Sequence, residues 1–186
     1  MQTIQPVQLE EVGGPVLRLL EIVKSERAAF FNEKGSLANM MQTMAQSPRA
    51  MDAYLKFHRT LAEGSLPARI REQIALAVAQ ANQCEYSLAQ HVSLAQRLGL
   101  AHDEIVASRE ARSTDPKVSA ALQFAKALVT HNGEFSTEQL ADAGYNDSEI
   151  VEIVAQVALN SFENYFNAAV KTDLDFPKVA LAAKAA

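Results

Sequence analysis

The chain has 186 residues, of which 48% are hydrophobic and 21% are charged, so it is long enough to bury one sizeable core. This ordinary globular composition excludes disorder along most of the chain. The formal net charge is −5 and no run of Lys or Arg stands out, which argues against binding to nucleic acid or to an anionic membrane surface.

Targeting signals and cysteine usage both point to the cytoplasm. No window approaches the ~20 consecutive apolar residues of a membrane-spanning helix, and the N-terminus lacks the basic start and apolar stretch of a signal peptide. A single cysteine, Cys84, cannot support a disulfide within the chain. A lone cysteine is more often a small buried apolar residue than a reactive one.

The periodicity of the chain is helical almost throughout. Gly, Pro and Asn separate the periodic stretches, and no alternating run of β-branched residues predicts a strand. In chain order, helices are expected over about 15–29, 37–45, 48–64, 67–81, 84–98, 117–130 and 147–170. Ser136 and Asn146 are expected to cap further helix starts. We therefore predict an all-α, single-domain helical bundle over residues 1–186.

Two of these helices have unusual compositions. A methionine cluster in the second helix is most simply core filler, although it can also line a pocket; its members are Met40, Met41 and Met44. The last helix is apolar over most of its circumference, which predicts burial in the core or against another subunit. Its amides Asn160, Asn164 and Asn167 recur at i, i+4 and i+7 and are expected either to line a polar pocket or to be satisfied core or interface amides.

The turn at 82–83 predicts a helical hairpin that brings Glu72 and His91 together. Glu72 lies about ten residues before the turn and His91 about eight after it, so at ~1.5 Å per residue both lie at a similar depth. Glu72 sits on a helix that is apolar nearly all round, where a carboxylate needs a partner. A purely structural pair, or a salt bridge to Arg69 or Arg71, is the alternative to a catalytic role.

The second helix of the hairpin carries the thiol. Cys84, Ser87 and His91 share one face, and Cys84 is predicted in the first turn, where the helix dipole favours a thiolate. Because Cys84 and His91 lie ~10 Å apart along the axis, His91 reaches only Ser87. We predict a relay that runs from Glu72 through His91 and Ser87 to Cys84 and includes a water.

These residues resemble a known family pattern. Glu72, the motif Cys84-Glu-Tyr-Ser87 and then His91 are similar to the glutamate, Cys-x-x-Cys and histidine of the alkyl hydroperoxidase D / carboxymuconolactone decarboxylase superfamily. Flanking stretches resemble its peroxidase-related branch at residues 39–48, 65–79, 164–167 and 173–177. The resemblance extends over about 7–177.

The resemblance implies an all-α fold of the alkyl hydroperoxidase D-like type, with a carboxymuconolactone decarboxylase-like core at about 37–131. It also implies assembly into homo-oligomers, as trimers or hexamers. It further implies a cofactor-free antioxidant enzyme that reduces a hydroperoxide and is itself reduced by an external thiol.

Carried over to this chain, the family roles fall on five residues. Cys84 matches the first cysteine and is predicted as the nucleophile, His91 as the general base and Glu72 as its orienter. Tyr86, inside the motif, and Ser87 are predicted to position the reacting groups.

The chain departs from the family pattern at Ser87, where the second cysteine is expected. A serine hydroxyl cannot be oxidised to a sulfenic acid, so no disulfide forms within this motif. Cys84 is then expected to act as a one-cysteine peroxidase. Alternatively, Glu72 and His91 perform acid–base chemistry on a small carboxylate or lactone, as in the decarboxylase branch. The third alternative is that the chain is a catalytically silent binding member, or that the serine was introduced deliberately.

Other kinds of site gain little support. A hydrolase that uses Ser87 as nucleophile is disfavoured because Ser87 lies inside a helix, without a strained elbow. We predict no metal site, because the remaining histidines fall on different elements; these are His58, His102 and His131. The sequence contains no glycine-rich phosphate loop, so a nucleotide cofactor is not predicted.

Overall fold

The computed structural model of the chain describes residues 2–8, 13–26, 30–130 and 136–182. Its helices are α1 (Pro15–Glu26), α2 (Asn39–Met44), α3 (Pro48–Ala62), α4 (Ala68–Ala81), α5 (Glu85–Arg97), α6 (His102–Arg109), α7 (Pro116–Thr130), α8 (Thr137–Asp142) and α9 (Asp147–Val170). Within the described ranges there is no β-strand. The all-α prediction is therefore confirmed.

Most helix boundaries lie within a few residues of the predicted ones, but α6 was not predicted. Its N-cap is Ala101, whose side chain cannot accept a hydrogen bond, and the Glu104 carboxylate instead accepts the Ala101 N–H at 2.9 Å. The cap predicted at Asn146 is confirmed, because Asn146 and Glu149 exchange reciprocal hydrogen bonds of 3.0 and 2.9 Å. Ser136 is the N-cap residue of α8, as predicted, but its side chain makes no capping hydrogen bond.

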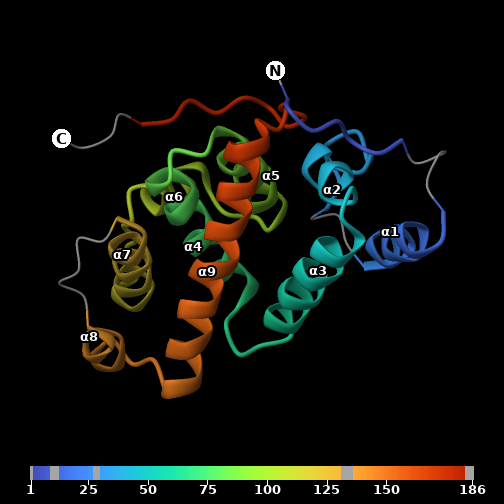
Figure 1. Cartoon of the computed structure of the whole chain (residues 1–186). Coiled ribbons are helices and arrows are strands. Elements are labelled where there is room, and N and C mark those ends of the chain that lie inside the picture. The colour runs from blue at the N-terminus through green and yellow to red at the C-terminus, as the bar shows by residue number, and fades with distance from the viewer. Residues whose placement is uncertain (1, 9–12, 27–29, 131–135, 183–186) are drawn as a thin grey trace.

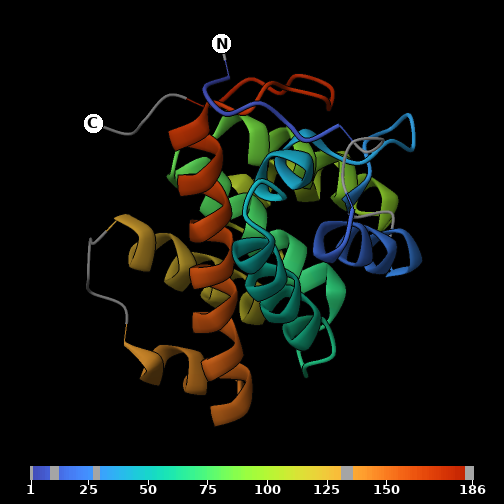
Figure 2. The ribbon, with the colours of Figure 1, turned by 45° about the vertical axis from the view of Figure 1, so that its right-hand side comes forward.

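Helix α4 is the centre of the molecule. It packs against α5, α6, α7 and α9, and its residues from Gln73 to Gln80 are all buried. Figures 1 and 2 show the long α9 crossing the molecule, with α1 and α3 on one side of it and α7 and α8 on the other. A continuous apolar surface explains why α4 is buried, because Ala, Ile, Leu and Val cover most of its circumference.

The two terminal segments lie together across one end of α9 (Figure 1). The Thr3 N–H donates to the Val170 carbonyl at 2.8 Å. The segment after α9 continues along this end and is fixed by Arg109, whose guanidinium donates to the Ala180 carbonyl at 2.6 Å.

The methionine cluster and the last helix test two predictions about the core. Met40, Met41 and Met44 are buried and belong to the core, as the core-filler interpretation predicts. Helix α9 is buried on one face only. Its opposite face exposes large apolar side chains, which are Val151, Val154, Phe162 and Tyr165.

None of the helices in the described part of the chain combines the length and hydropathy that crossing a membrane requires.

Candidate active site

The α4–α5 hairpin brings Glu72 and His91 into contact. Gln83 takes a left-handed backbone conformation with φ of 54°, which reverses the chain between the two helices. The Glu72 Oε1 and His91 Nδ1 atoms then lie 2.7 Å apart. This confirms the predicted contact. Arg69 pairs instead with Glu104, at 3.0 Å.

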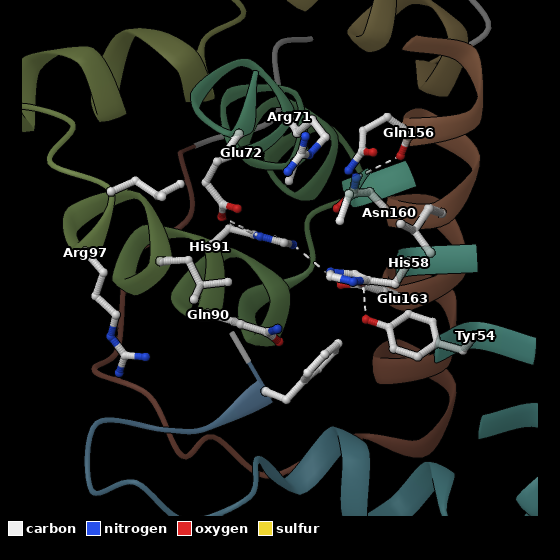
Figure 3. A pocket seen from close by; sticks show the side chains of 17 residues that line it. Tyr54, His58, Arg71, Glu72, Gln90, His91, Arg97, Gln156, Asn160 and Glu163 are labelled. Carbon is white, nitrogen blue, oxygen red and sulfur yellow. Dashed lines mark hydrogen bonds and ion pairs between the residues drawn. The ribbon is translucent and has the colours of Figure 1, made fainter. Parts of the chain in front are cut away.

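A second carboxylate, Glu163 of α9, faces the other side of the imidazole (Figure 3). The His91 Nε2 and Glu163 Oε2 atoms lie 3.5 Å apart, and the Tyr54 hydroxyl of α3 donates to Glu163 Oε1 at 2.7 Å. Glu163 is only 2% exposed. Sequence reasoning missed this residue, although a carboxylate on the apolar α9 is a signal of a buried charge that needs a partner.

The two carboxylates set the charge of His91. Burial on its own disfavours the imidazolium, but Glu72 and Glu163 outweigh it and raise the pKa of His91 to about 10. Burial also acts to raise the pKa of Glu163, yet His91 and Tyr54 hold it below its usual value. The pKa of Tyr54 is raised by burial and by Glu163. At neutral pH the site therefore holds an imidazolium between two carboxylates, beside a neutral phenol.

This arrangement predicts a pH dependence of stability. The pKa of His91 is about 10 in the folded chain, against roughly 6.5 for an unfolded histidine. The stabilisation is therefore fully present below about pH 6.5 and is lost as the pH rises through about 10. Denaturant unfolding of wild type and of His91→Gln at several pH values measures this stabilisation. The difference in the free energy of unfolding between the two proteins is expected to shrink between pH 7 and 10. A difference that stays constant over that range would contradict it. The exposed His102 provides the control, because His102→Gln is expected to behave as wild type.

A cavity of about 260 Å³ opens onto His91 and both carboxylates. Its wall combines apolar, amide and charged side chains from α3, α4, α5 and α9, together with Phe30. The lining residues are Phe30, Tyr54, His58, Ala62, Ala68, Arg71, Glu72, Ala75, Gln90, His91, Leu94, Arg97, Leu98, Gln156, Leu159, Asn160 and Glu163. A mostly apolar wall with a few convergent polar groups suits a small organic molecule.

Cys84 lies outside this cavity, near the start of α5. It is the N-cap residue, with extended backbone (φ −92°, ψ 101°), so its predicted place in the first turn is wrong. The helix starts one residue later because the left-handed Gln83 leads into an extended residue before helical geometry begins. The Cys84 thiol donates to Ser87 Oγ at 3.3 Å, and both residues are buried.

The predicted contact between Ser87 and His91 is not formed. Among the described contacts, Ser87 Oγ accepts hydrogen bonds from the Cys84 thiol and from Asn167 Nδ2, the latter at 3.1 Å. The two ring nitrogens of His91 face Glu72 and Glu163 instead. The competing partner comes from α9, so spacing along α5 alone does not reveal it.

Tyr86 packs away from the cavity. Its hydroxyl accepts the Met40 N–H at 3.1 Å, and its ring meets Phe176 edge to face at 5.8 Å between centroids. Burial raises its pKa, as does the nearby Asp175. Tyr86 thus joins α2 and the C-terminal segment to the start of α5.

In the described ranges, no group of three or more His, Cys, Asp or Glu residues is placed to hold a metal ion. His58 contacts the Phe30 ring, with 4.9 Å between centroids, and His102 is exposed. His131 lies outside the described residues.

Comparisons with known proteins agree on the fold. The sequence model of the Carboxymuconolactone decarboxylase family matches residues 48–128. A cysteine-to-alanine variant of the debrominase Bmp8, in complex with 2,3,4-tribromopyrrole, is 23% identical with a TM-score of 0.75, over 94% of this chain and 92% of that chain. Apo Bmp8 is 25% identical with a TM-score of 0.72, over 92% of this chain and 91% of that chain.

A further similar structure is a peroxidase-related protein with an alkylhydroperoxidase AhpD core, from Ralstonia eutropha JMP134. It is 22% identical with a TM-score of 0.75, over 93% of this chain and 92% of that chain. No curated protein matches the chain significantly in sequence.

Proposed function

We propose that the chain is a member of the alkyl hydroperoxidase D / carboxymuconolactone decarboxylase superfamily and a thiol-dependent enzyme that reduces a small hydroperoxide, as its fold and the family match over residues 48–128 support. The observation that carries the proposal is the imidazolium of His91, held between Glu72 and Glu163 on the wall of a cavity. The same helix begins with the hydrogen-bonded pair of Cys84 and Ser87.

The proposed reaction transfers two electrons from Cys84. Cys84 first releases its thiol proton to water. The resulting thiolate attacks the terminal oxygen of the hydroperoxide, so an S–O bond forms and the O–O bond breaks. The departing alkoxide takes a proton from His91 and leaves as an alcohol, and Cys84 becomes a sulfenic acid. Two equivalents of an external thiol then restore the Cys84 thiol and release water and a disulfide.

In this scheme His91 is a proton donor, in place of the general base that the sequence suggested. A pKa of about 10 keeps the proton on His91 at neutral pH until a stronger base, such as an alkoxide, forms beside it. Glu72 and Glu163 hold the ring in place and maintain its charge. Water then replaces the proton on His91 after each turnover.

A second candidate is acid–base chemistry on a small carboxylate or lactone, with His91 protonating the carbanion that is left when carbon dioxide departs. Two observations favour it. Arg71 and Arg97 lie on the cavity wall, where they suit an anionic substrate, whereas Cys84 does not line the cavity. The debrominase that shares the fold also indicates that peroxides are not the sole substrates this fold accommodates.

Alkylation of the thiol separates the two candidates. The enzyme is treated with iodoacetamide and then assayed for hydroperoxide consumption with dithiothreitol, and for carbon dioxide release from a carboxymuconolactone. The proposed function predicts that alkylation of Cys84 stops hydroperoxide consumption. Unchanged consumption, or carbon dioxide release that survives alkylation, would favour the second candidate.

The proposal includes a homo-oligomer, a trimer or a hexamer, in the cytoplasm. The exposed apolar face of α9, which carries Val151, Val154, Phe162 and Tyr165, supports contact with another copy, because such faces on monomers usually mark interaction sites. A reducing compartment suits an enzyme that depends on external thiols. Light scattering after size-exclusion chromatography measures the assembly.

A further inference from the structure

Five buried polar atoms without a hydrogen-bond partner gather where α5 meets α9. They are Gln90 Oε1, His91 Nε2, Glu163 Oε2, Asn164 Nδ2 and Asn164 Oδ1. Of these, His91 Nε2 and Glu163 Oε2 face each other as an ion pair at 3.5 Å, too far apart for a good hydrogen bond. Each of these four residues is at least nine-tenths buried. Folded proteins pair nearly all such atoms with protein groups, water or a ligand. A cluster of unpaired donors and acceptors therefore indicates a place where a small polar group binds.

The register of the two helices shows where this cluster lies. Ser87 of α5 meets Asn167 of α9 at 3.1 Å, and His91 meets Glu163 at 3.5 Å. As residue numbers rise along α5 they fall along α9, so the helices are antiparallel.

This register places Gln90 and Asn164 at the same level, between the Ser87 and His91 levels. Gln90 also lines the cavity, and Figure 3 shows it projecting from α5 beside His91, towards Tyr54 and Glu163. The two amides therefore lie between the proton donor and the serine that contacts Cys84.

The unpaired atoms specify the chemistry of the ligand. The imidazolium Nε2–H of His91 and Nδ2 of Asn164 are donors, while Oε1 of Gln90, Oδ1 of Asn164 and Oε2 of Glu163 are acceptors. A matching group must both donate and accept. A carboxylate has no proton to donate and is repelled by Glu163, whereas a hydroperoxide has one O–H donor and two acceptor oxygens.

We propose that Gln90 and Asn164 form a polar subsite that binds the O–OH group of a hydroperoxide between His91 and Cys84. The inner oxygen accepts from His91. The terminal oxygen accepts from Asn164 and donates its proton to Gln90, and so faces Cys84. The inference rests on the proposed function and adds the two residues that orient the peroxide for the S–O bond formation described above.

The apolar part of the cavity would hold the organic part of the substrate. Phe30, Leu94 and Leu98 line it. The subsite therefore favours an organic hydroperoxide with a small apolar substituent, such as cumene hydroperoxide, over a carboxylate of similar size.

The test compares two reactions of the same thiol. Asn164→Leu and, separately, Gln90→Leu are made in the full chain, and single-turnover oxidation of Cys84 by cumene hydroperoxide is followed by mass spectrometry. Alkylation of Cys84 by iodoacetamide is measured in parallel, because it does not need the subsite. We expect the oxidation rate to fall by about 10²-fold, because the peroxide loses the orientation that S–O bond formation requires. The alkylation rate is expected to stay within about twofold of wild type, because the thiol itself is untouched.

A matched control uses a buried amide away from the contact between α5 and α9. Gln73 is buried on α4 and donates to Ser108 Oγ at 3.2 Å, so Gln73→Leu is expected to oxidise at the wild-type rate. Thermal unfolding is recorded for every variant. Asn164→Leu is expected to be at least as stable as wild type, because it removes two unpaired buried atoms.

The outcomes separate the subsite from the proposed function. Wild-type oxidation rates in both Asn164→Leu and Gln90→Leu would overturn the subsite and leave thiol peroxidase chemistry intact. Equal losses of oxidation and alkylation would also overturn it, since the thiol itself would then be disturbed. A wild-type enzyme in which cumene hydroperoxide leaves Cys84 unoxidised would instead remove the proposed function, and the peroxide subsite with it.

Discussion

Replacement of Cys84 with serine is expected to lower thiol-dependent hydroperoxide consumption by about 10³-fold or more, because no group is left that can donate two electrons. Cys84 is the only cysteine in the chain, so no other thiol can take over. Serine is nearly isosteric, and as an N-cap residue it is well suited to the extended backbone at this position. The fold of Cys84→Ser is therefore expected to remain intact.

The measurement is a steady-state assay with cumene hydroperoxide and dithiothreitol, together with circular dichroism and denaturant unfolding of the same preparation. Ser93→Ala serves as the control, because Ser93 is buried on the same helix outside the cavity. A Cys84→Ser enzyme that turns over at the wild-type rate would show that the electrons come from elsewhere, and would favour the acid–base candidate.

Removal of the imidazolium is expected to impair both activity and stability. His91→Gln loses the proton donor, and general acid catalysis of this kind contributes about 10²–10⁴-fold. It also leaves Glu72 and Glu163 without their shared cation. Loss of one partner from a buried ion pair typically costs about 3–5 kcal/mol, so the free energy of unfolding should fall by an amount of this order.

A second substitution separates these two effects. Adding Glu163→Gln to His91→Gln removes one of the two carboxylates left facing each other, so stability should recover in part while activity stays low. The rate of hydroperoxide reduction and the free energy of unfolding are measured for both single variants and the double variant. Full turnover by His91→Gln would exclude His91 as the proton donor.

Local spacing predicted the fold class and one of the two contacts between His91 and a carboxylate, the contact with Glu72. Helical periodicity, the Gly, Pro and Asn residues that separate periodic stretches, and the turn at 82–83 are properties of a few neighbouring residues, so most helices and the α4–α5 hairpin follow from them. The contact between Glu72 and His91 was predictable because the rise of a helix is constant on both sides of a short turn.

The rest of the site depends on α9, whose position no local pattern encodes. Glu163 and Asn167 reach His91 and Ser87 from a helix far along the chain. Asn167 explains the error in the predicted relay, because it forms a hydrogen bond with Ser87 in place of the expected contact between Ser87 and His91. The second carboxylate helps raise the pKa of His91, which is why we propose a proton donor where the sequence suggested a general base. The i, i+4, i+7 spacing of the α9 amides indicated a polar face on this helix. The residues that this face contacts follow only from the register of α9 against α5.

The most direct test of the central claim is mass spectrometry of the intact protein after one equivalent of cumene hydroperoxide at pH 7, in the presence of dimedone. The proposed mechanism predicts a dimedone adduct on Cys84 in wild type, formed much more slowly in His91→Gln. Unmodified Cys84 after complete exposure to the peroxide would contradict thiol peroxidase chemistry and make Cys84 a packing residue of the core.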